Sequence, residues 1–520
     1  MNLTKESKRI IACSCVLNYA IYIFMRLFFY STYESQLDIM MQAAICGVSG
    51  TKTAYILYSN VIIGWILKGL TTIFPFINWY FAFLCGCVLC ALSIIGYVIV
   101  RRTNNKIGWT VAVVLSSFMG YECYVLPGHM KTASVLGLAM LVVAADYLER
   151  ENGKSRKWEV LIVLLAVLSS MVSFSVFWIT VLIGLVGPLS CYVFKNIGKI
   201  RAWIKKERNM NKETVKQAAF LCGCIFIGAA LFRTVDCVVY HMSGQEDATK
   251  HRSAMVRMYG YGMGDYDDSY AEKYGIDSVE YAAIKNGSFA VVNETGWEKL
   301  EELSKERQKI SGTALNSYFK NVPISLFKYG IFYLYVVMMF MLFFSPVKKK
   351  SVIIWTQIAL LFVVFFVLYV FHSWQNNWMV FVVVLSLLLP MLLALKGGQE
   401  KDYQYLWVYL AVFSIILYSK FSSGMVSSVS EESMSEKFSA LNSEQVNLVD
   451  LNNYFRTFSA QRIYTAGVLQ NESVTVTNGA YALMEGFEHK VLSEYPSESA
   501  GYEWIYNSKN LSVWDLVFED

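Results

Sequence analysis

The chain contains few charged residues and little proline. Of its 520 residues, 16% are Asp, Glu, Lys or Arg, whereas soluble domains carry about a quarter. Only seven prolines occur, so long helices meet few interruptions. The first shortage argues against an ordinary soluble globular protein, and the second favours long, continuous helices.

Disulfide frameworks, nucleic-acid surfaces and common metal motifs are also missing. The polar segments 241–325 and 420–520 contain no cysteine, so we expect no disulfide framework. The five histidines show no His-Glu-x-x-His spacing. Basic and acidic residues number 45 and 40, and no basic stripe with interleaved aromatics occurs. We therefore expect no nucleic-acid partner.

Long apolar runs are what the chain has in abundance. Hydrophobic residues make up 55% of it and the mean hydropathy is +0.40. Runs of about twenty apolar residues match the thickness of a bilayer core. The pattern predicts an all-α polytopic membrane protein with about eleven transmembrane helices. The expected spans are 9–30, 79–100, 107–126, 132–148, 158–172, 173–194, 218–240, 326–345, 352–371, 378–395 and 406–419.

The loops between these spans differ in charge. Lysine and arginine gather in alternate loops, for example at Arg101 and Arg102 and in the range 195–216. Short cytoplasmic loops carry such an excess, which predicts a cytoplasmic N-terminus in a multi-pass protein of the cell membrane. The assignment requires that segment 53–74, which contains Lys68, does not cross the bilayer. We interpret that segment as a re-entrant or interfacial helix at the outer face.

Two parts of the chain follow from this topology. Residues 1–419 form a transmembrane domain that includes the outer loops 31–78 and 241–325. Residues 420–520 form a small extracytoplasmic segment. Within it, Val474–Thr477 followed by Asn-Gly is typical of a strand and a turn. A mixed α/β structure is predicted there.

Two acidic residues follow the first predicted span directly. Glu34 and Asp38 would share one face of a helix, because they are four residues apart. A carboxylate held at the membrane surface can deprotonate a hydroxyl or bind a divalent cation. Asp38 is the candidate base, and the candidate ligand of any such cation. The alternative interpretation is that both are ordinary solvated loop acids.

Cationic side chains are predicted at the same outer face. Arg233 lies within an apolar run, where a charge marks a ligand path or a buried pair, and Asp236 could neutralise it. Lys131 and His129 occupy one short outer loop and His372 another. Each histidine has the alternative interpretation of a plain surface residue.

The outer loop 241–325 adds a further cluster of polar residues. A glycine- and tyrosine-rich stretch carries two arginines and could bind a sugar or a phosphate. An ordered surface loop is the alternative interpretation. The candidates in this loop are Arg252, Arg257, Asp265 and Tyr266.

The order of motifs in residues 1–340 resembles the GT-C superfamily of membrane glycosyltransferases, in particular a branch of bacterial GT-C-like proteins. The matching features are the acidic motif at Asp38, the stretch 45–47, the helix of Asn60, Gly64 and Leu67, and the segment 74–80, Phe-Pro-Phe-Ile-Asn-Trp-Tyr. The resemblance implies inverting transfer of a sugar from a polyprenyl-phosphate donor to a surface glycan or lipid-linked acceptor. In that reaction Asp38 would be the base.

The chain also departs from the family pattern. Leu37 occupies the position of a first aspartate, and arginines expected near residues 170–175 and 372–378 are absent. The resemblance implies that Arg233, Lys131, Arg252 and Arg257 would meet the donor phosphate. The missing arginines leave the donor and the activity open. A divalent cation is the one cofactor that the acidic motif suggests.

Other functions fit the same sequence features. A polysaccharide repeat-unit polymerase also works on lipid-linked glycans, and its large outer loops resemble segment 241–325. A non-catalytic membrane scaffold would explain the lost aspartate and arginines. A transporter fits less well, because neither inverted repeats nor polar residues at the bilayer midplane occur.

Overall fold

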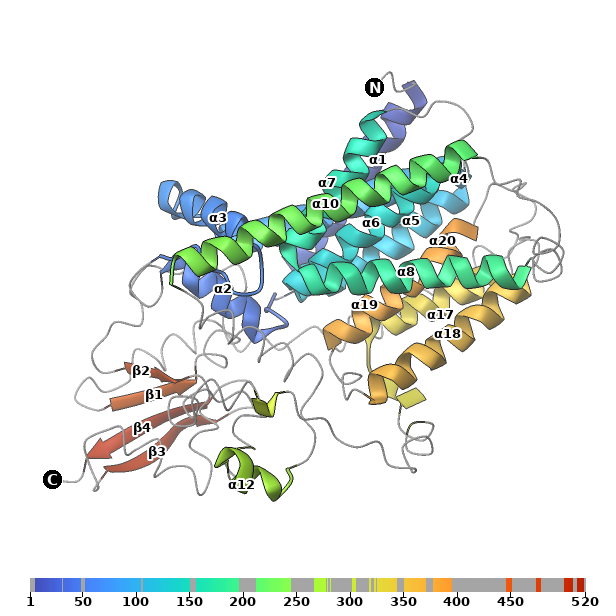
Figure 1. Ribbon diagram of the computed structural model, residues 1–520. Helices are drawn as coiled ribbons and strands as arrows, with labels where there is room; N and C mark the ends of the chain where they lie inside the picture. The colour runs from blue at the N-terminus through green and yellow to red at the C-terminus, as the bar shows by residue number, and fades with distance from the viewer. Residues whose placement is uncertain are drawn as a thin grey trace.

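In the computed structural model (Figure 1), six helices among the described residues are long and apolar enough to cross a membrane. The chain is thus a helical protein with six candidate membrane spans. They are α1 (Lys5–Phe28), α4 (Trp79–Thr103), α6 (His129–Glu149), α10 (Lys212–Met242), α18 (Lys350–Val370), and α19 (Asn377–Leu387) joined to α20 (Leu389–Ala394).

The structure describes most of the helical part of the chain and the strands near its end. The described residues are 5–29, 31–47, 52–103, 106–149, 156–195, 212–244, 266–276, 278, 281, 302–304, 318, 322–323, 325–343, 350–370, 377–394, 446–450, 474–477, 500–507 and 512–518.

Each of the six helices coincides with a predicted span, which confirms the multi-pass helical character of the chain. Further helices occupy four more of the predicted positions. The predicted span 406–419 lies outside the described residues, so the number eleven stays a prediction. These further helices are α5 (Lys106–Gly120) with the π-helix η1 (Tyr121–Val125), α7 (Arg156–Val172), α8 (Phe174–Lys195) and α17 (Gly330–Phe343).

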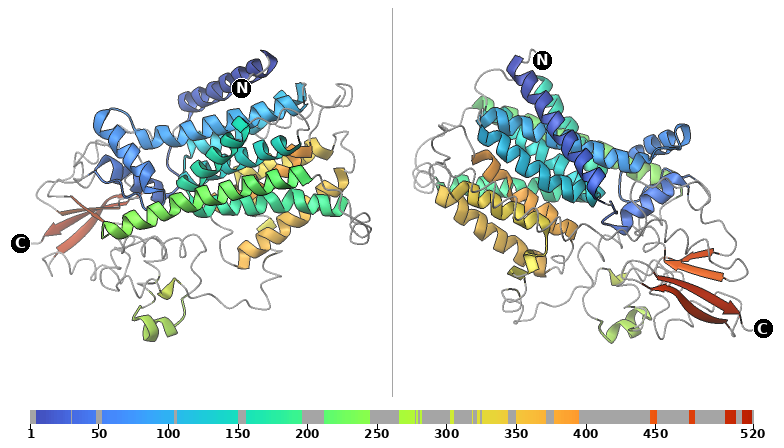
Figure 2. Two further views of the ribbon diagram at one scale, coloured as in Figure 1. Left: turned by 45° about the horizontal axis from the view of Figure 1, so that its top comes forward. Right: turned by 180° about the vertical axis from the view of Figure 1, so that it is seen from behind.

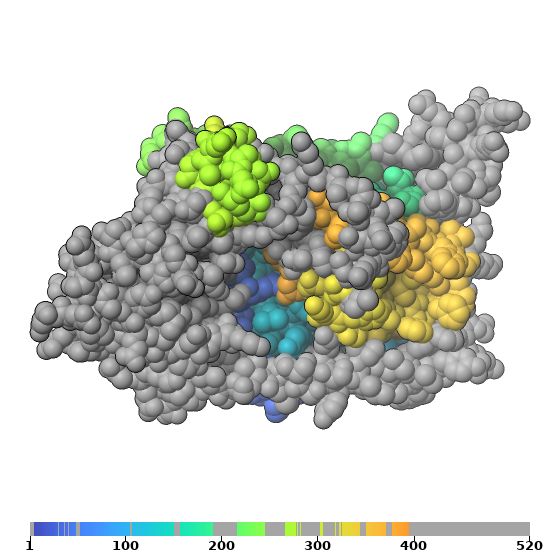
Figure 3. All heavy atoms as spheres, turned by 90° about the horizontal axis from the view of Figure 1, so that it is seen from below, coloured from blue at the N-terminus to red at the C-terminus, as the bar shows by residue number. Residues whose placement is uncertain are grey.

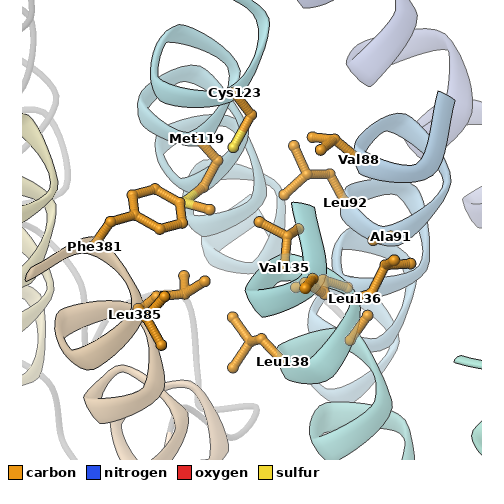
Figure 4. Packing of buried hydrophobic residues seen from close by; sticks show 14 of the residues in the cluster. Val88, Ala91, Leu92, Met119, Cys123, Val135, Leu136, Leu138, Phe381 and Leu385 are labelled. Carbon is orange, nitrogen blue, oxygen red and sulfur yellow. The ribbon is translucent and has the colours of Figure 1, made fainter. Parts of the chain in front are cut away.

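Helix α6 lies at the centre of the bundle. It packs against α4, α7, α8 and α19, and its residues Val135, Leu136 and Leu138 meet apolar side chains of α4 and α19 (Figure 4). By contrast α1 runs along the outside (Figure 2) and exposes Val16 and Leu27. Such apolar faces are costly in water and favourable in lipid, in keeping with a bilayer around the bundle.

Two short helices, α2 (Gln36–Cys46) and α3 (Val61–Ile73), lie at one end of the bundle (Figure 1). Ser35 caps α2 and Asn60 caps α3, each by accepting a hydrogen bond from a backbone N–H two residues on. At 13 residues α3 is about 20 Å long, which is shorter than a bilayer core. This length agrees with the prediction that segment 53–74 is not a full span.

The opposite ends of α4 and α6 carry ion pairs. Arg101 pairs with Asp146, and Arg102 Nη2 lies 3.0 Å from Glu149 Oε2. The bundle is therefore polarised: α2 and α3 lie at one end, and the arginine pairs close the other.

Outside the bundle the structure describes a short helix and a sheet. The helix α12 (Ser269–Tyr274) ends at Gly275, which has a positive φ of 69°. The sheet has the order β2-β1-β4-β3 and includes the predicted strand at Val474–Thr477 as β2. The other strands are β1 (Val446–Asp450), β3 (Ala500–Asn507) and β4 (Ser512–Phe518).

Gly64 offers a direct test of how α3 packs. A Cβ atom at this position would lie 2.0 Å from the backbone oxygen of Ala54. Because overpacking costs about 1–3 kcal/mol, we expect Gly64→Ala to lower the unfolding free energy by about 2 kcal/mol. Thermal unfolding of the detergent-solubilised protein measures the change.

The control variant is Gly69→Ala in the same helix, where a Cβ atom would meet nothing within 4 Å. Alanine favours helices over glycine by about 1 kcal/mol, so this variant should keep or raise the melting temperature. Equal melting temperatures for the two variants would contradict the close approach of α3 to residue 54.

Candidate functional site

Asp38 lies in the first turn of α2 and is completely buried. The helix begins at this place because Ser35 caps it and because an acidic residue in the first turn favours the helix N-terminus. The interpretation of Asp38 as a solvated loop acid is therefore wrong. A buried carboxylate needs specific partners, because leaving it unpaired would be costly.

One oxygen of this carboxylate holds three elements together. Asp38 Oδ1 accepts a hydrogen bond of 2.6 Å from the Tyr80 hydroxyl of α4 and one of 2.8 Å from the backbone N–H of His129, the first residue of α6. His129 Nδ1 lies 3.0 Å from the same oxygen. Because a carboxylate only accepts, this contact places a proton on Nδ1. Asp38 thus stabilises the N-terminus of α6 and orients the imidazole.

The second oxygen of Asp38 has no hydrogen-bond partner among the described residues, although it is buried. It faces Gly128, where a Cβ atom would lie 3.4 Å from Asp38 Oδ2 and 3.6 Å from Glu34 Oε2. Apart from its chain neighbours Pro127 and His129, no other described atom would lie within 4 Å of that Cβ. Two carboxylate oxygens therefore border a small space that the glycine leaves open.

A buried ionic network adjoins this space. Lys131 Nζ lies 3.2 Å from Glu34 Oε1 and 2.8 Å from Glu122 Oε2, and it is fully buried. Its ammonium also faces the Phe381 ring of α19 at 5.3 Å. Asn377, the first residue of α19, donates to Glu34. The network therefore joins α6 and η1 to the loop before α2 and to α19.

Three carboxylates and one lysine do not balance in charge. Asp38, Glu34 and Glu122 are acidic, whereas Lys131, in contact with Glu34 and Glu122, is the only lysine that the described part of the chain brings to the cluster. Excess negative charge in a buried site is relieved by protonation or by a bound cation. Burial raises the pKa of Glu34 to about 7 against the opposing effect of Lys131, and the Glu122 and Asp38 carboxylates raise it further.

The described residues contain no group of three or more His, Cys, Asp or Glu side chains arranged to hold a metal ion. The two carboxylates of Asp38 and Glu34 fall short of such a group, so the described residues identify no metal ligands in this cluster.

Arg233 lies in a separate polar cluster close by. Its Nη1 pairs with Asp236 Oδ2 at 2.9 Å within α10, as the alternative interpretation of the sequence held. The guanidinium borders a small cavity between α7, α8 and α10 that is also lined by Asn60 and Tyr58. The Tyr58 ring lies 6.2 Å from the His129 ring, centroid to centroid. Tyr58 therefore lies between the Arg233 cavity and the Asp38 cluster.

The remaining predicted site residues do not join the cluster or cannot be placed. Lys68 is half-buried on α3 and makes no contact with Asp38 among the described residues. Tyr266 donates to the backbone oxygen of Ile276 at 3.3 Å and packs against Tyr281. Four further candidates lie outside the described residues: Arg252, Arg257, Asp265 and His372.

The structure adds residues that the sequence reasoning did not select. Tyr80 lies in segment 74–80, which carries part of the family resemblance, but its sequence context indicated no role for its side chain. Glu122 is an acid within the predicted span 107–126, and a charge inside a membrane is a signal that could have identified it. It lies in η1, and single-turn π-helices often mark functional sites. Asn377 carried no signal in the sequence.

Seen from below, blue and teal atoms of the N-terminal part of the chain lie beside yellow and orange atoms of its later helices (Figure 3). Two close approaches join these parts of the chain: Asn377 of α19 donates to Glu34, and Gly330 of α17 lies against Glu122 of η1. A Cβ atom on Gly330 would lie 2.3 Å from Glu122 Oε1. The start of α17 therefore closes one side of the ionic network.

The raised pKa of Glu34 has a consequence for stability. Its pKa is about 7 in the folded chain and 4.5 ordinarily, so the folded state binds the proton more tightly between these values. Stability should therefore fall as the pH rises from about 5 to about 7, with a slope from this group of roughly 1 kcal/mol per pH unit. We expect Glu34→Gln to flatten that slope in melting temperatures measured against pH.

Glu6→Gln is the matched control for this measurement, because it removes one carboxylate from the exposed start of α1. It should leave the slope of the unmodified chain in place. An unchanged slope in Glu34→Gln would show that Glu34 does not titrate in this range.

No protein family model matches the chain, and the chain has no match among the curated proteins or the solved structures. No family is therefore identified for the chain by these comparisons. The structure shows a helical protein with six candidate membrane spans in its described part.

Proposed function

We propose that the protein is a membrane glycosyltransferase that moves a sugar from a polyprenyl-phosphate donor to a hydroxyl of a cell-surface glycan or lipid-linked acceptor. The reaction takes place at the outer face of the cytoplasmic membrane. Asp38 acts as the general base on the acceptor hydroxyl.

The arrangement of the Asp38 carboxylate is the observation that carries the proposal. Tyr80 and His129 hold Oδ1, which fixes the orientation of the group. The buried Oδ2 has no partner among the described residues. An oriented carboxylate oxygen without a donor is suited to accept the hydrogen of an incoming hydroxyl. Most buried side-chain polar atoms have a hydrogen-bond partner, so the unpartnered Oδ2 favours a role beyond packing.

The polarity of the bundle supports the outer face. The Asp38 cluster lies at the beginnings of α4 and α6, and the Arg101 and Arg102 ion pairs lie at their far ends. Helix α4 has 25 residues and a length of about 37 Å, enough to separate the two ends across a bilayer core. The positive-inside rule favours the arginine end as the cytoplasmic one, and the Asp38 cluster would then lie at the outer face.

Arg233 is the cation best placed to meet the donor phosphate. Lys131 is fully buried and contacts two carboxylates, whereas Arg233 contacts one, that of Asp236. The Arg233 side chain is 36% exposed and borders the cavity that reaches Tyr58. A phosphate on the exposed side of this guanidinium would have positive charge available to stabilise the leaving group, and Tyr58 lies between the arginine and the imidazole of His129.

The proposal predicts that Asp38→Asn abolishes transfer. The asparagine oxygen can still accept the hydrogen bonds from Tyr80 and His129, so the fold should persist while the base is lost. General bases contribute about 10²–10⁴-fold, so transfer should fall at least about a hundredfold. The measurement is mass spectrometry of lipid-linked glycans from cells with the unmodified chain, with the variant, and without the chain.

Asp146→Asn is the matched control, because it also removes a buried carboxylate, from the ion pair with Arg101 at the far end of the bundle. Transfer per folded molecule should persist in it. Retained transfer in Asp38→Asn would remove the base assignment. Products longer by whole repeat units would instead identify a polymerase working at the same site.

A further inference from the structure

A base as deeply buried as Asp38 must release the proton that it takes up in the proposed reaction. Each transfer leaves the acceptor's proton on the carboxylate, and the residue is 0% exposed. The carboxylate must lose that proton before the next acceptor is deprotonated. Since Oδ1 is occupied by Tyr80 and His129, the proton must leave from Oδ2.

Glu34 supplies the only other side-chain oxygen among the described residues within 4 Å of the position that a Cβ atom of Gly128 would occupy. Asp38 Oδ2 and Glu34 Oε2 both border that position, at 3.4 and 3.6 Å from it. Such a polar gap suits a single bridging water, which accepts from one carboxyl and donates to the other.

Glu34 also lies nearer to solvent than Asp38. Its side chain is 11% exposed, whereas that of Asp38 is 1% exposed. The charged groups that face Glu34 are Lys131 of α6, Glu122 of η1 and Asp38 of α2. Lys131 holds Oε1 at 3.2 Å, and Asn377 of α19 donates to the same oxygen. These contacts turn Oε2 toward the gap.

We propose that Glu34 is the proton exit of the site: it takes the proton from Asp38 across the space above Gly128 and releases it to solvent. The acceptor O–H bond breaks as the oxygen attacks the anomeric carbon, and the polyprenyl phosphate departs with the electron pair of the broken C–O bond. The proton passes to Asp38 Oδ2, then to Glu34 Oε2, then to water. This inference rests on the proposed function.

The electrostatic surroundings of Glu34 suit this task. A group that must accept and release protons near neutral pH works best when its pKa lies close to the ambient pH. Burial raises the pKa of Glu34 to about 7, with Lys131 opposing the rise. The unprotonated form accepts the proton, so turnover should increase as the pH rises through about 7.

Glu34→Gln separates proton exit from the chemical step. The purified protein is placed in vesicles made from the total lipid extract of cells that lack the gene, and products are followed over time. We expect a burst of about one product per protein, since Asp38 begins unprotonated, and then turnover slowed at least about tenfold. The increase of the steady rate through pH 7 should disappear, and Glu34→Asp should restore part of the rate.

Gly128→Ala closes the gap without removing a titratable group. A methyl group there meets the two oxygens at ordinary contact distances, so the melting temperature should stay unchanged while the same burst and slow phase appear. The control is Gly86→Ala, where a Cβ atom would meet nothing within 4 Å; it should show steady turnover without a burst.

The outcomes distinguish the two proposals. Loss of transfer in Asp38→Asn together with unmodified rates and pH profiles in Glu34→Gln and Gly128→Ala would overturn the proton exit and leave the transferase intact. Full transfer in Asp38→Asn would overturn both. A burst in Glu34→Gln and Gly128→Ala, absent from Gly86→Ala, supports the exit, because a merely structural defect would lower the burst as well.

Discussion

The hydrogen bonds on Asp38 Oδ1 are the constraint on which the site depends. They tie α2, which lies at the end of the bundle, to the beginnings of α4 and α6. A buried carboxylate that lost these donors would be strongly destabilising, so the ends of the three helices must keep their positions together. The same contacts that close the fold at this end also leave the other oxygen facing the space above Gly128.

The Lys131 network extends this constraint to distant parts of the chain. A buried ammonium is tolerable only where acceptors surround it, and here they come from Glu34, from the side chain and backbone oxygen of Glu122, and from the Phe381 ring. Asn377 adds a contact from α19 to the first loop of the protein. The later helices thereby become part of a site whose carboxylates and lysine lie in the first 131 residues.

Burial has opposite effects on the function that we propose. It strengthens the electrostatic interactions of a carboxylate with a substrate, because the surroundings have a low dielectric constant. It also separates the carboxylate from the water that would accept its proton. In the proposed reaction, a second carboxylate closer to the surface resolves this conflict. The absence of a side chain at Gly128 leaves room for the proton to pass from one carboxylate to the other. Because the cluster has more carboxylates than lysines, one of them, Glu34 in this proposal, can hold a proton and release it.

The sequence by itself determined the helical membrane architecture, since runs of about twenty apolar residues have few other stable solutions. It also singled out Asp38, Glu34, His129 and Lys131, because charged residues beside apolar runs are costly enough to be conspicuous. Only the tertiary structure decided that these four lie together, that Lys131 contacts two acids, and that Tyr80 and Asn377 complete the cluster. Tyrosine and asparagine are common at helix ends, so the residue type alone does not indicate a role in the site. Hydrophobic periodicity specifies which face of a helix is buried, whereas the identity of its neighbours depends on how helices far apart in the chain pack.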